Sequence, residues 1–188
     1  MRSLSTFSNR TDDISNFKVW FGEDAAATMV DWVVDNFPAS EIGDGKILDC
    51  GCGNGHLLFS LVEEDYPEEN LLGIDYSDAS IQLCQAIAQS KDVQGIQWKT
   101  ADCLADDITS KLGNFELILD KGTYDAICLG TQNQDCPVHP SAIYVKNIAS
   151  LLAKDGLFLI TSCNWTKDEL IHRMSFAGKS TNQQTVNQ

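Results

Sequence analysis

The sequence has no long hydrophobic run and few basic residues. No apolar stretch approaches the roughly 20 residues that a membrane-spanning helix needs. Residues 1–10 are polar except for Leu4 and Phe7, which is not the pattern of a secretory signal. Only 13 lysines and arginines stand against 27 acidic residues, which gives a formal net charge of −14. We therefore expect neither a membrane nor a nucleic acid as partner, whereas a basic partner, or one that presents a lysine, suits this charge.

Paired cysteines and clustered histidines are also missing. The 7 cysteines are an odd number with irregular spacing, and Cys50 and Cys52 form the only close pair. The histidines, His56, His139 and His172, are far apart in the sequence. Zinc sites use duplicated cysteine pairs, or cysteines with paired histidines, so we expect no metal. Without a secretory signal the cysteines are expected to be free thiols, and we predict a protein of the cytoplasm that also occurs in the nucleus.

One domain accounts for a chain of this size. A single domain typically has about 100–200 residues, and 188 residues can bury a hydrophobic core without disulfides. Residues 1–16 and 177–188 are rich in polar side chains, and we expect them to be disordered tails. The folded domain is then expected at residues 17–176, acting as a monomer.

Between the tails, helical patterns alternate with short apolar segments that have the length of strands. Apolar residues from Met29 to Phe37 recur at helical spacing and predict a helix over 23–37. Further helices are expected at 56–66, 77–91, 139–154 and 166–174, and strands at 46–50, 71–75, 95–99, 115–120 and 157–161. Strands that are apolar throughout are buried on both faces, which predicts an α/β, Rossmann-like fold with a mostly parallel sheet. Ligands bind such sheets beyond the carboxyl ends of the strands.

A glycine-rich turn, Gly51 to Gly55, follows the first predicted strand and opens a helix. Glycines permit a tight turn and let a ligand lie against the main chain, while the helix start offers free N–H groups. Alone, this GxGxG pattern suits nicotinamide, flavin or S-adenosylmethionine, or only close packing of the helix on the strand. The nicotinamide fingerprint is GxGxxG, so the third glycine comes one position early for that dinucleotide.

Two carboxylates flank this turn. Asp49 lies just before the first glycine, and Asp75 ends the second predicted strand. A carboxylate in the position of Asp75 accepts hydrogen bonds from ribose hydroxyls. The alternative for Asp75 is a charge at a helix start, since Ser77 is a good N-cap, and the alternative for Asp49 is capping of the N–H groups of the turn.

These features, with the acidic–small pair Asp102-Cys103 after the third strand, resemble the class I S-adenosylmethionine-dependent methyltransferases. The resemblance implies this fold, S-adenosylmethionine as the methyl donor, and no metal. The alternative for Asp102 is a loop aspartate that stabilises its own turn. The resemblance implies that the donor lies against Trp20, Asp49, Gly51, Cys52, Gly53, Asn54, Gly55, Asp75, Tyr76, Asp102, Cys103 and Asp120.

A second motif, DKGTYDAI at 120–127, follows the fourth predicted strand. Together with VWFGED at 19–24 and TSCNW at 161–165, it resembles the lysine methyltransferases that act on translation elongation factor 1-alpha, over about residues 18–170. The resemblance implies that elongation factor 1-alpha is the protein substrate. It implies catalytic roles for Asp120, at the incoming amine, and Tyr124, with Trp20 and Trp165 beside the lysine. Each aromatic ring has the alternative of simple packing.

The sequence departs from this family at its end. The family sheet has seven strands and ends in an antiparallel pair, whereas we count five strands here and expect a C-terminally truncated sheet. An open edge of that kind is normally covered. Two other functions therefore stay open: a methyltransferase with a small-molecule or other protein acceptor, and a non-catalytic module that only holds the donor.

Overall fold

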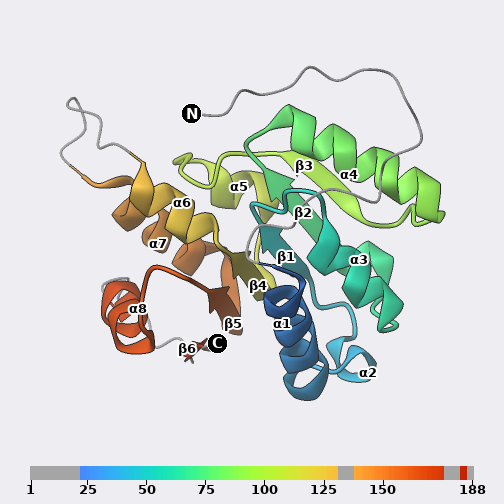
Figure 1. Cartoon of the computed structure of the whole chain (residues 1–188), viewed down its shortest axis with the longest axis horizontal. Helices are drawn as coiled ribbons and strands as arrows, with labels where there is room; N and C mark the ends of the chain where they lie inside the picture. Colours follow the sequence, from blue (N-terminus) through green and yellow to red (C-terminus); the bar gives the residue numbers. More distant parts are fainter. Residues whose placement is uncertain (1–21, 131–137, 176–182, 186–188) are drawn as a thin grey trace.

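A parallel sheet with the strand order β3-β2-β1-β4-β5-β6 forms the centre of the protein (Figure 1). The computed structural model describes residues 22–130, 138–175 and 183–185. Every neighbouring pair of strands runs parallel. The five predicted strands and the α/β, Rossmann-like fold are confirmed. The strands are β1 (Ile47–Cys50), β2 (Leu71–Asp75), β3 (Gln97–Thr100), β4 (Phe115–Lys121), β5 (Leu152–Thr161) and β6 (Gln183–Thr185).

Helices cover both faces of this sheet (Figure 1). One face carries α1 (Gly22–Asn36), α3 (His56–Glu63) and α4 (Asp78–Lys91). The other carries α5 (Ile108–Leu112), α6 (Thr123–Leu129), α7 (Pro140–Leu151) and α8 (Lys167–Met174). Short turns at α2 (Ala39–Ile42) and η2 (Glu68–Asn70) complete the connections. Within the described residues, no helix combines the length and the apolar character that crossing a membrane requires.

The two faces of β1 show why three of its four residues are apolar. Successive side chains of a strand point to opposite faces. Ile47 packs into the core under α1 and α3, while Leu48 and Cys50 pack into the core under α5 to α8. All four residues of β1 are buried, as expected for the central strand of a sheet covered on both sides.

Polar residues cap two of the predicted helices. The Ser77 hydroxyl accepts a hydrogen bond from the Ser80 N–H at 3.4 Å and caps α4. Thr166 caps α8 in a reciprocal capping box with Glu169. The carboxyl end of β2 and the loop after β5 are therefore each followed by a helix whose start is fixed by side chains.

The junction between α7 and β5 differs from the predicted helix over 139–154. The helix ends at Leu151, and β5 begins at once. Asp155 has a φ of 65°, and Gly156 lies so close to the backbone of Phe115 that a Cβ there would be 2.9 Å from its carbonyl oxygen. This bulge shifts the register between β4 and β5. A left-handed residue followed by a tightly packed glycine cannot continue a helix, so residues 152–156 join the strand instead.

The carboxyl end of the chain adds a strand that the sequence did not predict. Residues 177–188 were expected to form a disordered tail, but β6 pairs in parallel with residues 158–160 of β5. The outer edge of β5 offers unpaired backbone N–H and C=O groups, and a short segment can satisfy them without any apolar pattern of its own. The other residues of this tail, and the whole predicted tail at 1–16, lie outside the described residues.

Candidate active site

The carboxyl ends of β1, β2 and β4 meet where the strand order reverses. β2 and β3 lie on one side of β1, while β4 and β5 lie on the other. In open parallel sheets this switch point forms the ligand crevice. Three predicted site residues lie here: Asp49 in β1, Asp75 at the end of β2 and Asp120 in β4.

The glycine-rich turn leaves β1 at this point and opens α3. Gly51, Gly53 and Gly55 all have left-handed φ angles, of 77°, 57° and 76°, which other residues rarely adopt. A Cβ at Gly53 would meet no atom within 4 Å, so its main chain borders open space. Beneath the turn, Trp98 of β3 packs so closely that a Cβ on Gly55 would be 2.6 Å from its ring. The turn thus presents bare backbone outward on a rigid base.

Cys52 and Asn54, which were also predicted to contact the methyl donor, lie in the same turn. Cys52 is buried, with its sulfur 4.0 Å from that of Cys84, so its side chain faces the protein interior. The side-chain Oδ1 of Asn54 accepts a hydrogen bond from the His56 N–H at 3.3 Å and holds the start of α3. Any contact from Cys52 to a ligand would therefore come from its backbone.

Asp75 holds the glycine turn against the end of β2. One of its carboxylate oxygens accepts a hydrogen bond from the Gly53 N–H at 3.0 Å, and the other accepts one from the Ser77 N–H at 2.9 Å. The residue is 7% exposed, whereas the adjacent Tyr76 is 82% exposed. The structure thus joins a carboxylate, the open backbone of Gly53 and a free aromatic ring at one point. Contact of Asp75 with a ribose stays a prediction.

The Asp102-Cys103 pair follows β3 on the same edge of the sheet. The Asp102 side chain is exposed and accepts a hydrogen bond from the Leu104 N–H at 2.8 Å, as the turn-stabilising alternative requires. Cys103 is buried, with its sulfur 2.7 Å from that of Cys50, so its side chain faces the core. The predicted contact with an adenine edge then falls to the Asp102 side chain and to the backbone of Cys103.

Burial gives Asp49 an unusual acidity. It raises the pKa of this carboxyl from the ordinary 3.8 to about 7; Lys121 opposes the rise, whereas Asp120 and Asp75 add to it. Burial also lowers the pKa of Lys121, against the attraction of Asp49 and Asp120. A carboxyl with a pKa near 7 exchanges its proton around neutral pH. The switch point therefore concentrates acidic groups whose charge depends on what binds beside them.

Asp120 is fully buried and surrounded by hydrogen-bond donors. It accepts hydrogen bonds from the N–H groups of Thr123, at 2.7 Å, and Tyr124, at 3.0 Å, and from the Tyr144 hydroxyl at 2.6 Å. Burial raises its pKa to about 7, and these three donors oppose the rise. The residue is 0% exposed. Its carboxylate therefore holds the start of α6 through two N–H groups and connects it to α7 through the Tyr144 hydroxyl. A direct contact between Asp120 and an incoming amine stays a prediction.

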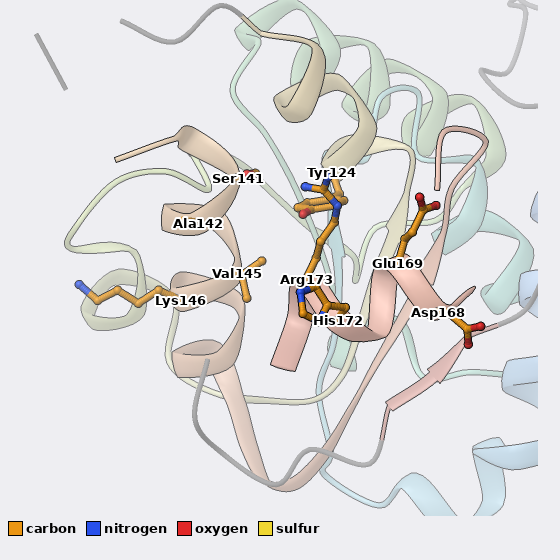
Figure 2. A pocket seen from close by; sticks show the side chains of 9 residues that line it. All are labelled: Tyr124, Ser141, Ala142, Val145, Lys146, Asp168, Glu169, His172 and Arg173. Atoms are coloured by element: carbon orange, nitrogen blue, oxygen red, sulfur yellow. The ribbon is translucent and has the colours of Figure 1, made fainter. Parts of the chain in front are cut away.

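Tyr124 lies on the wall of a cavity of about 890 Å³ between α6, α7 and α8 (Figure 2). Its ring is 5.8 Å from that of Tyr144, and burial raises the pKa of its hydroxyl, against the influence of Arg173. Arg173 also stacks over Trp165, with its guanidinium carbon 3.6 Å from the ring centre. Arg173 thus links Tyr124 and Trp165, and contact of either ring with a lysine stays a prediction. Trp20 lies outside the described residues.

Comparison with known proteins assigns the chain to a family. A family model described as a methyltransferase domain matches residues 43–187. This chain is a member of that methyltransferase family. The match contains the glycine turn, all the described strands and the segment after β4. The family is the one that the sequence resemblance indicated. No group of three or more histidine, cysteine or acidic side chains suited to a metal ion occurs in the described parts of this methyltransferase.

Curated relatives of the methyltransferase carry names of one kind. Protein-lysine N-methyltransferase efm4 of Schizosaccharomyces pombe is 39% identical over 94% of this chain and 76% of its own length. Protein-lysine N-methyltransferase EFM4 of Saccharomyces cerevisiae is 40% identical over 81% of this chain and 66% of its own length. EEF1A lysine methyltransferase 2 of Homo sapiens is 37% identical over 93% of this chain and 68% of its own length. The chain belongs with these lysine methyltransferases and spans about two thirds to three quarters of their lengths.

Solved structures support the fold alone. The StiE O-MT structure, residues 961–1257, has a TM-score of 0.60 at 19% identity and covers 83% of this chain and 51% of its own. SAM-bound CalS10, an amino pentose methyltransferase from Micromonospora echinaspora, has a TM-score of 0.53 at 22% identity over 81% of this chain and 54% of its own.

The sequence analysis missed residues that hold the site of the methyltransferase together. Asp125 was not among the predicted site residues, yet it is 1% exposed and accepts hydrogen bonds from the Ser162 hydroxyl at 2.6 Å and the Cys163 N–H at 2.9 Å. The Ser162 hydroxyl in turn accepts from the N–H of Asn164, at 3.1 Å, and from that of Trp165, at 3.2 Å. The DKGTYDAI and TSCNW segments are therefore joined in space. Their position after neighbouring strands was the one signal in the sequence for this pairing.

Proposed function

We propose that this chain is an S-adenosylmethionine-dependent protein-lysine N-methyltransferase that acts on translation elongation factor 1-alpha. The observation that carries the proposal is the contact between its two motifs. The Thr123 hydroxyl of the DKGTYDAI segment donates a hydrogen bond to the Cys50 carbonyl, at 2.6 Å, where the glycine turn begins. A donor and an acceptor bound at these segments would be neighbours, as methyl transfer requires. The acceptor is proposed from the name of one relative, EEF1A lysine methyltransferase 2.

The residues at the switch point fit the donor. The Gly53 backbone borders open space, Asp75 offers a carboxylate beside it, and Tyr76 is exposed next to both. The Cys103 N–H makes no hydrogen bond within the described parts of the chain, so a ring nitrogen of the donor can accept it. When bound, S-adenosylmethionine supplies a methyl group on a sulfonium. We propose that it is held by the predicted set: Trp20, Asp49, Gly51, Cys52, Gly53, Asn54, Gly55, Asp75, Tyr76, Asp102, Cys103 and Asp120.

Residues of the chain are proposed to position the acceptor lysine and to influence the charge of its amine. A free lysine has a pKa of about 10.4, so the site must hold the amine in its neutral form. We propose that Tyr124 lies against the acceptor side chain and excludes water. For Asp120 the geometry favours an indirect role, since its carboxylate fixes the Tyr124 N–H and the start of α6. Asp49, with a pKa of about 7, lies near enough to Lys121 and Asp120 to respond to their charge.

Mass spectrometry tests this proposal. Purified chain, S-adenosylmethionine and elongation factor 1-alpha are incubated, and digested peptides of the factor are searched for lysines that have gained methyl mass. We expect methylation with the wild type and its loss with Asp75→Ala. A chain that binds S-adenosylhomocysteine but adds no methyl group to any lysine of the factor would contradict the proposed substrate. A parallel panel of RNA and small amines would then find the acceptor.

The proposal extends to the setting of the enzyme. We propose that it acts as a monomer in the cytoplasm and the nucleus. Its acidic charge suits a basic protein acceptor better than nucleic acid. Analytical ultracentrifugation and imaging of the tagged chain test these two points.

A further inference from the structure

The loop after β3 is fixed at both of its ends. The Ala101 N–H donates a hydrogen bond to the Asp75 carbonyl at 2.9 Å, which ties the start of the loop to the end of β2. The Ala105 N–H donates to the Asp102 carbonyl at 3.0 Å and closes a turn. Between these bonds lie the exposed Asp102 side chain and the N–H of Cys103, which makes no hydrogen bond within the described residues; both follow the carboxyl end of β3, the edge where the donor is proposed to bind.

A buried amide of α7 holds this turn from behind. Asn147 is 4% exposed, and its side-chain nitrogen donates to the carbonyls of Cys103, at 2.9 Å, and Ala105, at 3.1 Å. These are the two carbonyls on either side of Leu104. The side-chain amide of Asn147 therefore donates both of its hydrogens to the backbone of the segment that carries the predicted adenine contacts.

Burying an amide costs free energy unless its hydrogen bonds are made. The neighbours of Asn147 in the core beneath α7, Val145 and Ile148, are apolar, so an apolar side chain there would meet the needs of packing. What the amide adds is a fixed orientation for a short loop whose other ties are the Ala101 bond to β2 and its own turn. The orientation decides where the Cys103 N–H and the Asp102 carboxylate point.

We infer that Asn147 is a positioning residue that sets the adenine-reading edge of the donor site. The inference rests on the proposed donor. Asn147 touches the loop backbone and acts on the nucleobase only through it. The chemistry read at this edge is specific: a carboxylate accepts from the exocyclic amino group of adenine, and a backbone N–H donates to a ring nitrogen. Hypoxanthine reverses both groups, since it carries a carbonyl and a ring N–H instead.

Calorimetric titration with two nucleosides tests the inference without any turnover. S-adenosylhomocysteine and S-inosylhomocysteine are each titrated into wild-type chain and into Asn147→Leu, which keeps the branched shape and the number of heavy atoms and loses both donors. We expect the Kd of S-adenosylhomocysteine to rise about tenfold in the variant, while the preference for adenine over hypoxanthine falls toward one. Asn147→Ser, whose shorter side chain cannot reach both carbonyls, is the second variant if Asn147→Leu does not fold, and we expect the same direction.

Ile148→Val is the matched control, because it weakens packing at the next position of α7 and removes no hydrogen bond to the loop. It should lower thermal stability and leave the preference for adenine unchanged. An Asn147 variant that weakens both nucleosides by the same factor, or weakens neither, overturns the inference and leaves the donor proposal standing. A wild-type chain that binds neither nucleoside overturns both.

Discussion

The Thr123 hydroxyl donates a hydrogen bond to the Cys50 carbonyl at 2.6 Å, and this bond joins the start of α6 to the glycine turn. Thr123 also lies directly over Gly51, where a Cβ would overlap its hydroxyl. The two motifs that define the proposed enzyme are thus packed on each other. Their relative position depends on a glycine that leaves room and on a threonine that fills it.

We predict that Thr123→Val destabilises the protein and weakens donor binding. Valine keeps the shape but leaves the carbonyl of the fully buried Cys50 without its partner, at a cost of about 1–3 kcal/mol. Thermal unfolding and calorimetry with S-adenosylhomocysteine measure the two effects. Thr123→Ser keeps the hydroxyl and should lie close to wild type. If the valine and serine variants behave alike, the hydrogen bond does not couple the motifs.

The second prediction concerns Asp75. Asp75→Ala removes the acceptor of the Gly53 and Ser77 N–H groups together with the proposed ribose contact. We expect the Kd of S-adenosylhomocysteine to rise at least about tenfold, because charge-assisted hydrogen bonds are lost. Ser77→Ala, which removes the helix cap alone, serves as control and should reduce stability with a smaller effect on binding. Unchanged affinity in Asp75→Ala would show that the nucleoside binds elsewhere.

The third prediction separates acceptor from donor. Asp125 holds the Ser162 hydroxyl and the Cys163 N–H, so it shapes the loop that leads to Trp165. We expect Asp125→Ala to raise the KM for the protein acceptor about tenfold, since a buried charged partner of two donors is removed. The Kd of S-adenosylhomocysteine should change little. Steady-state kinetics with varied acceptor measures this, and Ser162→Ala should show a weaker effect in the same direction. A rise in donor Kd equal to the rise in KM would contradict the assignment.

The fourth prediction is a pH dependence of stability. Burial raises the pKa of both Asp49 and Asp120 from 3.8 to about 7, so the folded chain holds protons that the unfolded chain has released. Stability contributed by these groups is complete below about pH 4 and is lost as pH rises toward 7. We expect the thermal midpoint in the absence of ligands to fall between pH 5 and 7.5, by the equivalent of a few kcal/mol.

A substitution isolates this effect. Asp49→Asn, which carries no charge at any pH, should flatten the dependence and stabilise the chain most at the alkaline end. Circular dichroism melts across the pH range provide the measurement. A midpoint that rises between pH 5 and 7.5 in the wild type, with no difference in Asp49→Asn, would contradict the assigned pKa values.

Periodicity and strand composition predicted the fold because the central strands β1, β2 and β4 are buried on both faces. Residues 71–75 were predicted with the observed bounds, since Asp75 and Ser77 mark the end of the strand and the start of the helix. The predicted helix at 139–154 ran too far because the bulge at Asp155 and Gly156 depends on packing against β4. β6 has no apolar pattern, and its pairing depends on the edge of β5, which a local pattern does not contain.

The site was predictable where its residues follow strands. Asp49, Asp75 and Asp120 meet at the switch point because parallel strands end at one edge. The orientation of Cys52 and Cys103 toward the core, and the burial of Asp120, depend on neighbours that come from other elements. Asn147 lay outside any motif, since its partners are backbone carbonyls more than 40 positions away and carry no sequence signal.

The ring of Trp98 lies against both Gly55 and Gly73, under the turn where the donor is proposed to bind. It is one of 4 tryptophans in the chain, and Trp165, stacked on Arg173, lies at the opposite side of the sheet. The fluorescence of an indole ring depends on its surroundings, so the emission of Trp98 is expected to change when a nucleoside binds at the turn. Its fluorescence would follow nucleoside binding without any label, and a Trp98→Phe variant would assign the signal.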